Sequence, residues 1–360
     1  MVVNSAFWHN KTVLITGHTG FKGSWLSLWL QQLGAKVVGY SLDPPTQVNL
    51  FEQANVSSGM KSIIGEIRDL ERLKQVFNEV QPEIVFHLAA QSLVRESFSD
   101  PVTTYSTNVM GSLNVLEAVR HTPSVRSVVM VSTDKCYDNK EWPWGYREVD
   151  PVGGHDPYSS SKGCMEIMLA SYRASYFPAD DYALHGTAIA SARAGNVIGG
   201  GDWAADRLVP DILNCIQHDQ PITLRYPNAI RPWQHVLEPL SGYMLLAEKL
   251  FEYGSHYAQS WNFGPGDSSA RSVKWIAEYM LKKSGLTTSV VMDTNAHPHE
   301  AHYLKLDCSK ANMELNWQPR WNLSVALDKV LSWSPSDEYP AQGICLQQIA
   351  DYSATKVHVQ

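Results

Sequence analysis

The stretch TVLITGHTGFKG, residues 12–23, joins a compact apolar run to a turn that contains three glycines. Gly17, Gly20 and Gly23 follow the spacing G-x-x-G-x-x-G, and a helical pattern over Trp25–Leu33 comes directly afterwards. Glycine allows a tight turn and a close approach of the backbone to a pyrophosphate, which then lies at the N-terminus of the following helix. The stretch therefore predicts a dinucleotide-binding βαβ unit at the beginning of the chain.

The same alternation of short apolar runs and helical patterns continues through the first half of the chain. The expected strands cover residues 36–40, 62–64, 83–88 and 127–131, and the expected helices cover residues 70–80 and 157–176. Apolar runs without polar alternation are typical of a parallel sheet that is covered on both faces. We therefore predict an α/β protein, a Rossmann doubly wound parallel sheet with a smaller C-terminal substrate-binding domain.

The second half of the chain has a looser pattern. From about Gly195, prolines, glycines and tryptophans mark loops such as GNVIGGGDW and RYPNAIRPW. We predict a dinucleotide-binding domain at residues 1–195, with a returning segment near 230–262, and a mainly substrate-binding domain at residues 196–360. The stretch after about Pro335 has the weakest pattern and receives no assignment.

The composition excludes several classes of protein. The chain has 360 residues, a net charge of −7, 44% hydrophobic and 18% charged residues, which is unlike a disordered chain or a basic nucleic-acid binder. Its five cysteines are scattered without a C-x-x-C pair, so neither a metal site nor a disulfide framework is expected. The N-terminus lacks a signal-peptide pattern, and no run of 18 apolar residues occurs, so we expect a cytoplasmic protein with no membrane partner.

A tyrosine and a lysine stand four residues apart at the start of the helix expected at 157–176. This spacing places Tyr158 and Lys162 on one helix face. The pKa of a tyrosine is ordinarily about 10, and a neighbouring ammonium lowers it, which makes the phenolate a usable base. Such pairs are also common on helix surfaces, so the functional interpretation depends on the glycine turn and on Ser132-Thr133 after the strand at 127–131.

The end of the second expected strand bears on which dinucleotide binds. Ser41 stands where an acidic residue would bind the ribose, and Asp43 follows two residues later. No arginine lies nearby to hold a 2′-phosphate, so NAD is favoured over NADP.

Several motifs together resemble those of the extended short-chain dehydrogenase/reductases, over roughly residues 9–330. They are the glycine turn, His87-Leu88-Ala89-Ala90, Ser132-Thr133, Tyr158-x-x-x-Lys162 and Arg193-x-Gly195-Asn196. Within that family, VSTDKCY at 131–137, WGYRE at 144–148 and GGHDPY at 153–158 are similar to the CDP-glucose 4,6-dehydratases. The related dTDP-glucose enzymes carry Asp-Glu where this chain has Asp134-Lys135.

The resemblance implies an NAD-dependent hydro-lyase that converts CDP-glucose into CDP-4-keto-6-deoxyglucose and water. The sugar is oxidised at C4, water is lost across C5–C6, and the hydride returns to C6. Such products enter dideoxyhexose synthesis for the O-antigen of lipopolysaccharide. The implied catalytic residues are Thr133 and Tyr158 at O4, Asp134 as the acid at O6, Lys135 as the base at C5, and Lys162 beside the nicotinamide ribose.

The resemblance also implies binding residues. For NAD they are Gly17, Thr19, Gly20, Phe21, Lys22, Gly23, Asp43, Glu66, Ile67, Leu88, Ala89, Ala90, Asn108, Tyr158 and Lys162. Glu66 stands where the family has an aspartate, and Asp69 is an alternative partner. For the nucleotide sugar they are Ser132, Arg193, Asn196, Arg207, Arg231, His235 and Asn262. Arg231 is the preferred diphosphate ligand, because an acidic protein needs a local bidentate cation to bind this anion.

Two alternative functions stay open at this point. A nucleotide-sugar 4-epimerase of the same fold would use Tyr158 and Lys162 but has no need of Asp134-Lys135. A catalytically silent dinucleotide-sensing regulator has no need of the Tyr–Lys pair. The expected assembly is a homodimer through the helix that contains Tyr158, or a dimer of dimers, and no nucleic-acid partner is expected.

Overall fold

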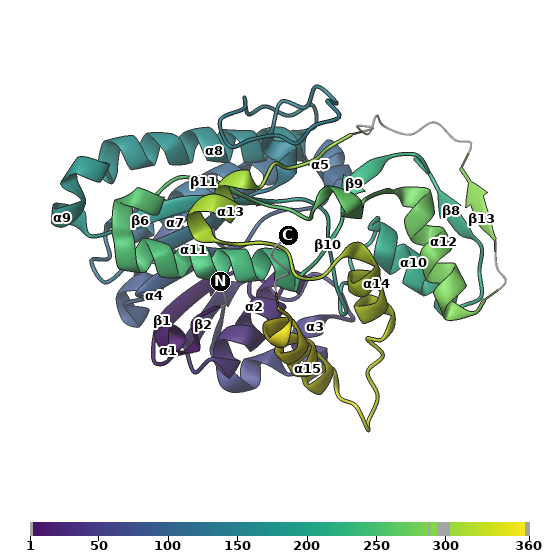
Figure 1. The fold of residues 1–360 in the computed structure, drawn as a ribbon. Coiled ribbons are helices and arrows are strands. Elements are labelled where there is room, and N and C mark those ends of the chain that lie inside the picture. Colours follow the sequence, from purple (N-terminus) through teal and green to yellow (C-terminus); the bar gives the residue numbers. More distant parts are fainter. Residues whose placement is uncertain (1–2, 287–288, 294–302, 357–360) are drawn as a thin grey trace.

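The computed structural model describes residues 3–286, 289–293 and 303–356, and its centre is a seven-stranded sheet (Figure 1). The strands lie in the order β11-β6-β5-β4-β1-β2-β3, and all neighbours are parallel. Their bounds are β1 (Thr12–Thr16), β2 (Lys36–Ser41), β3 (Lys61–Ile64), β4 (Ile84–His87), β5 (Ser127–Val131), β6 (Ala188–Ala194) and β11 (Ser260–Phe263). The direction of winding reverses between β1 and β4, which confirms the predicted doubly wound fold.

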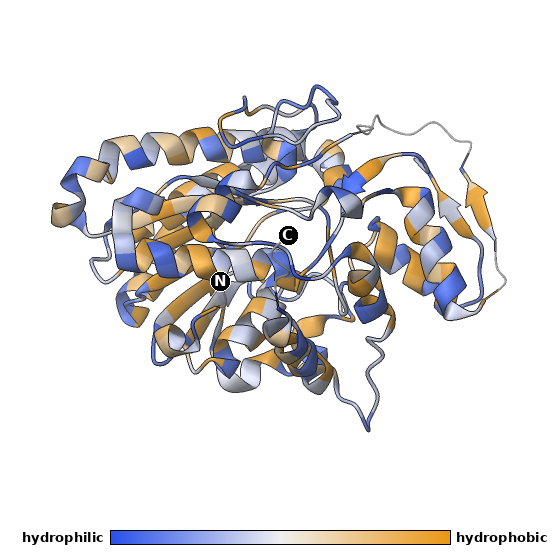
Figure 2. Ribbon diagram, in the orientation of Figure 1, coloured by the Kyte–Doolittle hydropathy of each residue, from blue (hydrophilic) through white to orange (hydrophobic). Residues whose placement is uncertain are grey.

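Helices cover both faces of the sheet, because successive strand side chains point to opposite sides. One layer contains α2 (Phe21–Gln32) and α11 (Leu237–Tyr253), and the other contains α4 (Leu70–Val80), α7 (Ser112–Arg120) and α8 (Pro157–Tyr176). In β1, Val13 and Ile15 pack in the first layer, while Leu14 packs in the second. Figure 2 shows the consequence, since the central strands are mostly hydrophobic whereas the helices carry polar residues as well.

The local sequence explains where the helices begin. Asp69 and Asp156 cap α4 and α8, each accepting a hydrogen bond from a backbone N–H of the first turn, and Pro157 occupies the first helical position of α8. Both helices have the predicted bounds. Helix α2 starts four residues before the predicted Trp25, because the third glycine of the turn lies inside its first turn.

The smaller part of the molecule lies at the right of Figure 1 and has a hydrophobic core of its own. It combines α10 (Leu208–Gln217), β8 (Ile222–Leu224), α12 (Val273–Ser284), β13 (Val290–Met292) and α14 (Leu323–Leu331). Between these segments the chain returns to the sheet and forms α11 and β11. Segments far apart in sequence therefore meet over the carboxyl ends of the strands.

The remaining elements are short, apart from α15. They are α1 (Ser5–Trp8), α3 (Leu50–Gln53), α5 (Val94–Ser99), α6 (Pro101–Tyr105), α9 (Tyr182–His185), α13 (Ser309–Leu315), α15 (Ala341–Ala354), β7 (Val197–Ile198), β9 (Ile230–Pro232), β10 (Gln234–His235) and β12 (Ala270–Ser272), with a π-helical turn at Ser106–Gly111. Within the described ranges, no helix has the length and apolarity that crossing a bilayer requires.

The C-terminal stretch, which the sequence left unassigned, packs as α15 against α2. The rings of Tyr352 and Trp29 meet edge to face, with centroids 5.7 Å apart. Glu238 of α11 fixes this helix, because it accepts hydrogen bonds from the Tyr352 hydroxyl (2.7 Å) and from the backbone N–H of Trp321 (2.7 Å). Burial raises the pKa of Glu238 to about 7, even though these hydrogen bonds oppose the shift.

We expect the substitution Glu238→Gln to weaken the pH dependence of stability. The carboxyl group has a pKa of 4.5 in the reference state and about 7 in the folded chain, so the folded state binds the proton more tightly. The stability that this group contributes is therefore complete below about pH 4.5 and is lost as the pH rises through about 7. Thermal melting of both proteins from pH 5 to 8 checks this, and an equally steep fall in the variant would contradict it.

Candidate active site

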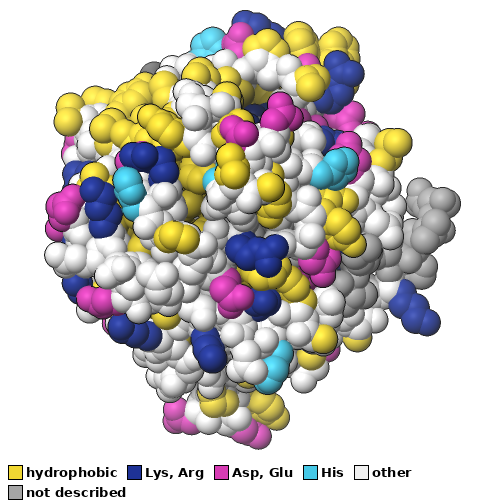
Figure 3. Space-filling view, turned by 90° about the vertical axis from the view of Figure 1, so that its left-hand side faces the viewer, with side chains coloured by type: hydrophobic (Ala, Val, Ile, Leu, Met, Phe, Trp, Pro, Cys, Tyr) yellow, Lys and Arg dark blue, Asp and Glu magenta, His cyan; other side chains and the backbone are white. Residues whose placement is uncertain are grey.

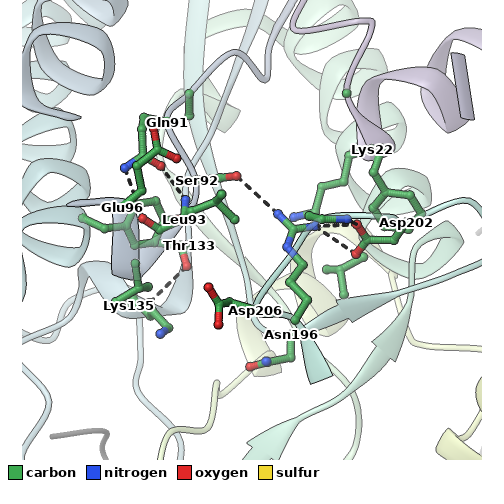
Figure 4. Close-up of a pocket in the computed structure, with 18 of the residues that line it drawn as sticks. Lys22, Gln91, Ser92, Leu93, Glu96, Thr133, Lys135, Asn196, Asp202 and Asp206 are labelled. Atoms are coloured by element: carbon green, nitrogen blue, oxygen red, sulfur yellow. Dashed lines mark hydrogen bonds and ion pairs between the residues drawn. The ribbon is translucent and has the colours of Figure 1, made fainter. Parts of the chain in front are cut away.

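A cavity of about 1220 Å³ lies at the carboxyl ends of the sheet strands (Figure 4). The segments that follow β1 to β6 each contribute to its wall, and the smaller part of the molecule supplies the opposite wall. Its volume exceeds the roughly 300–1,000 Å³ of a site for one small ligand. The cavity therefore has room for a dinucleotide and a second ligand.

The glycine turn forms the floor of one end of this cavity. Gly17 has φ +78°, and a Cβ atom there would lie 2.6 Å from the Ala89 backbone nitrogen. A Cβ atom on Gly23 would lie 2.1 Å from the Gly17 carbonyl oxygen. Gly20 is the N-cap residue of α2 and lines the cavity together with the first turn of the helix, so the N-terminus of α2 lies at the cavity wall. This cradle fits a pyrophosphate at a helix N-terminus.

Lys22 adds a cation to the cradle. It lines the cavity from the first turn of α2, and burial, together with the charges of Arg207 and Lys162, lowers its pKa to about 8. A negatively charged ligand would reverse this effect, because it favours the ammonium form.

The side chains after β2 and β3 lie at the outer end of the same cavity. The hydroxyl groups of Thr19 and Ser41 are hydrogen-bonded at 2.9 Å, and Asp43 lines the cavity as an exposed residue. Glu66 lines it as well and pairs with Arg68 at 2.7 Å. The alternative acid, Asp69, is instead the cap of α4 and does not line the cavity, so it is withdrawn as a ligand residue.

The five residues expected to be catalytic all line the cavity together, where β5 ends and α8 begins. Thr133 ends the extended backbone, and its hydroxyl donates to Asp134 Oδ1 at 3.0 Å. Asp134 is 2% exposed, and burial raises its pKa, although Lys135 and Thr133 oppose the shift. Among the described atoms, its Oδ2 has no hydrogen-bond partner. Asp134 is thus a buried carboxyl group that binds its proton more tightly than an exposed aspartate does.

Tyr158 and Lys162 line the same cavity as this carboxyl group, and burial has the largest effect on the pKa of each. Burial raises the pKa of Tyr158 to about 12, while a hydrogen bond with Thr133 lowers it. The ammonium group of Lys162 donates to the Val131 carbonyl oxygen at 3.3 Å. Burial lowers the pKa of Lys162 to about 8. Burial therefore determines the pKa of this phenol in the chain without ligands, and its lowering by Lys162 together with a bound nicotinamide stays a prediction.

Four residues predicted as direct ligands do not line the cavity. They are Asn108, Arg193, His235 and Asn262. Asn108 is fully buried in the π-helical turn, where its amide bonds to the backbone N–H and carbonyl of Gln91, each at 2.9 Å, and to the Ser161 hydroxyl. It positions the loop after β4 against α8, and we correct its assignment accordingly.

The other three lie in the packed interior beside the site. Arg193 forms a buried ion pair with Glu166 of α8, with an N–O distance of 2.9 Å, and it donates to the Tyr137 hydroxyl. Asn262 accepts a hydrogen bond from the same Tyr137 hydroxyl at 2.8 Å. His235 packs between the rings of Trp25 and Trp321. These side chains support the walls of the cavity from behind, and we correct their assignment from ligands to supports.

The remaining predicted ligands of the second molecule, Ser132, Asn196, Arg207 and Arg231, line the cavity. Arg207 pairs with Asp202 at 2.9 Å and donates to the Ser92 hydroxyl at 3.3 Å (Figure 4). The sequence alone did not identify several further lining residues, namely Ser92, Glu96, Asp202, Asp206 and Arg225. For Asp202 and Asp206 a signal was available, because both are charged residues that follow the three glycines at 199–201.

Comparisons with known proteins agree with this geometry. The sequence model of the GDP-mannose 4,6 dehydratase family matches residues 14–330. A CDP-glucose 4,6-dehydratase from Salmonella typhimurium is 54% identical over 332 residues, which cover 92% of each chain. The structure of a UDP-glucose 4-epimerase from Thermotoga maritima has a TM-score of 0.77 at 22% identity and covers 89% of this chain and 97% of that one. A dTDP-glucose 4,6-dehydratase from Bacillus anthracis, in complex with NAD, has a TM-score of 0.74 at 21% identity and covers 90% and 96%.

Proposed function

The chain belongs to the GDP-mannose 4,6 dehydratase family, and from this premise we propose that it is an NAD-dependent CDP-glucose 4,6-dehydratase. The enzyme converts CDP-glucose into CDP-4-keto-6-deoxyglucose and water. The 54% identity to the Salmonella CDP-glucose enzyme over nearly the whole of both chains supports this substrate.

One observation in the structure favours a dehydratase reaction. Asp134, a buried carboxyl group with a raised pKa, adjoins Lys135 in the same cavity as Tyr158 and Lys162. A 4-epimerase needs only an acid–base group at O4, whereas loss of water across C5–C6 needs an additional base and an additional acid. The pair therefore favours the dehydratase over the epimerase.

The cofactor site follows from the fit of the glycine cradle. We propose that the N-terminus of α2 and Lys22 hold the pyrophosphate of NAD, while Ser41, Asp43 and Glu66 lie at the adenosine end. The dinucleotide held there would supply the hydride acceptor for C4 and the hydride donor for C6, and its positively charged ring would lower the pKa of a neighbouring phenol.

In this proposal, three side chains of the cavity each carry out one proton transfer. Tyr158 accepts the proton of the O4 hydroxyl, and Thr133, which is hydrogen-bonded both to Tyr158 and to Asp134, lies between these two groups. Once C4 is a ketone, the C5 proton becomes acidic, and Lys135 removes it. Asp134 gives its proton to O6, so that water leaves. Burial favours this step, because it raises the pKa of Asp134 and so makes the protonated carboxyl group easier to form.

Domain roles and cellular setting are part of the same proposal. Residues 1–195, with the returning segment near 230–262, bind NAD, and residues 196–360 mainly bind the nucleotide sugar. The support is that α2 and the segments after β2 and β3 line the cavity from the first part of the chain, whereas α10 and β8 line it from the second. The reaction takes place in the cytoplasm and supplies dideoxyhexoses for O-antigen lipopolysaccharide, as is usual for CDP-linked 6-deoxy sugars.

The assembly that we propose is a homodimer, or a dimer of dimers, through α8. Five exposed residues of this 20-residue helix are uncharged and lie along one side of it. They are Cys164, Ile167, Ala170, Ser171 and Ala174. Ile167 is 61% exposed, and Val102 of the adjacent α6 is 78% exposed. Hydrophobic side chains also gather at the upper left of the end face in Figure 3. Sedimentation tests this, since a 40.2 kDa species alone would contradict the proposal.

The reaction is tested with CDP-glucose that carries deuterium at C4. We expect the label to appear at C6 of a 4-keto product, with no external reductant consumed. dTDP-, UDP- and GDP-glucose should turn over more slowly. Formation of CDP-galactose instead of the 4-keto sugar would identify an epimerase, and loss of the label to solvent would exclude the proposed hydride return.

The substitution Lys135→Met tests the proposed base at C5. It keeps the length of the side chain but removes the amine, so exchange of the C5 proton in deuterium oxide should fall by about 10² or more. Lys140→Met is the matched control, because Lys140 lines the cavity but pairs with Asp138 at 2.8 Å. Exchange at the wild-type rate in the Lys135 variant would assign the base to another group.

A further inference from the structure

The segment at residues 199–207 has contacts that the proposed reaction does not explain, and residues 201–207 of it line the cavity. It begins with three glycines that pack tightly between the two parts of the molecule. A Cβ atom on Gly200 would lie 1.9 Å from the Trp333 ring, and one on Gly201 would lie 2.6 Å from the Leu50 side chain. Gly201 also has φ +79°, and the Trp25 indole donates to the Gly200 carbonyl at 3.0 Å. The start of the segment is therefore fixed.

The residues that follow reach opposite walls of the cavity. Trp203 donates its indole N–H to Gln53 Oε1 at 3.1 Å, and Gln53 ends the helix α3 that follows β2. Arg207 reaches the Ser92 hydroxyl in the loop after β4, and it is held by Asp202 (Figure 4). Residues 202–207, which we call the strap, thus connect the walls that follow β2 and β4.

The strap lies next to the glycine cradle. Arg207 lowers the pKa of Lys22 in the first turn of α2, and Asp202 raises it, so both strap residues act directly on the cation of the cradle. Trp203 and Arg207 line the same cavity as Gly20 and Gly23. A pyrophosphate in the cradle would therefore lie between the helix N-terminus and the strap.

We propose that the strap retains the dinucleotide during turnover and that the hydrogen bond between Trp203 and Gln53 is its latch. The inference rests on the proposed function, because a cofactor that gives back its hydride within one turnover has to stay bound between the two transfers. Without the latch, the strap loses its hydrogen bond to α3 and frees the mouth of the cavity on that side. Dissociation of the cofactor then becomes faster.

Substitutions can remove the hydrogen bond of the latch without removing the packing of the tryptophan ring. Trp203 is 40% exposed, and its ring meets Trp333 edge to face at 6.3 Å. Phenylalanine keeps an aromatic ring at this place but lacks the N–H donor. Gln53→Ala removes the acceptor from an exposed position on α3 and leaves the strap sequence intact.

The test measures how fast bound NADH leaves the full-length protein. The protein is loaded with NADH and mixed with excess NAD, and the NADH fluorescence is followed in a stopped-flow instrument. We expect Trp203→Phe and Gln53→Ala each to raise the dissociation rate about fivefold, the effect of one hydrogen bond, and the double variant to release no faster than either. Trp144→Phe is the control, because Trp144 is exposed and does not line the cavity.

The outcomes separate this proposal from the one on which it rests. Release at the wild-type rate in both single variants, or additive effects in the double variant, would overturn the latch. If the wild-type protein binds neither NADH nor NAD, the proposed function itself fails. Faster release in both single variants with the same rate in the double variant supports the latch, whatever sugar nucleotide the enzyme prefers.

Discussion

The constraint on which the rest of the structure depends is the contact between the turn after β1 and the loop after β4. The strand order reverses between these two strands, so the chain leaves them in opposite directions and a crevice opens at their carboxyl ends. At Gly17, the space for a side chain is already filled by the backbone of Ala89, and at Gly23 by the carbonyl of Gly17. Only glycine fits at these two positions, and the helix N-terminus that they place in the crevice determines where an anionic ligand can lie.

Burial shifts the pKa values of the acidic and the basic groups around this crevice in opposite directions. The same removal from water raises the pKa of Asp134 and lowers the pKa values of Lys22 and Lys162, because it disfavours the charged form of each group. The chain without ligands thus contains a carboxyl group that holds its proton more tightly than usual, together with ammonium groups whose protons are held less tightly. A diphosphate would raise the pKa values of the lysines again, because it favours their ammonium form.

Much of the polar interior serves to hold these groups in place and touches no ligand. The ion pair of Arg193 with Glu166 connects β6 to the middle of α8, and its guanidinium also bonds to Tyr137 just beyond Asp134 and Lys135. Losing one member of such a buried pair leaves an unpaired charge, which costs about 3–5 kcal/mol. Asn108 does the same for the loop after β4 through the π-helical turn.

The sequence by itself determined the doubly wound sheet, the bounds of α4, α8 and β5 and the glycine turn, because these depend on local spacing and on the order of strands. The five residues proposed as catalytic came from the resemblance to known dehydratases, and they line one cavity in the structure. The sequence could not distinguish Arg193, Asn262 and His235 from ligands, since a motif does not show on which side of a cavity wall a side chain lies. The packing of α15 on α2 and the strap between Gln53 and Ser92 were likewise decided by the tertiary structure. Each joins residues more than 100 positions apart, and such contacts depend on the shapes of surfaces that exist only after the sheet and its two layers have formed.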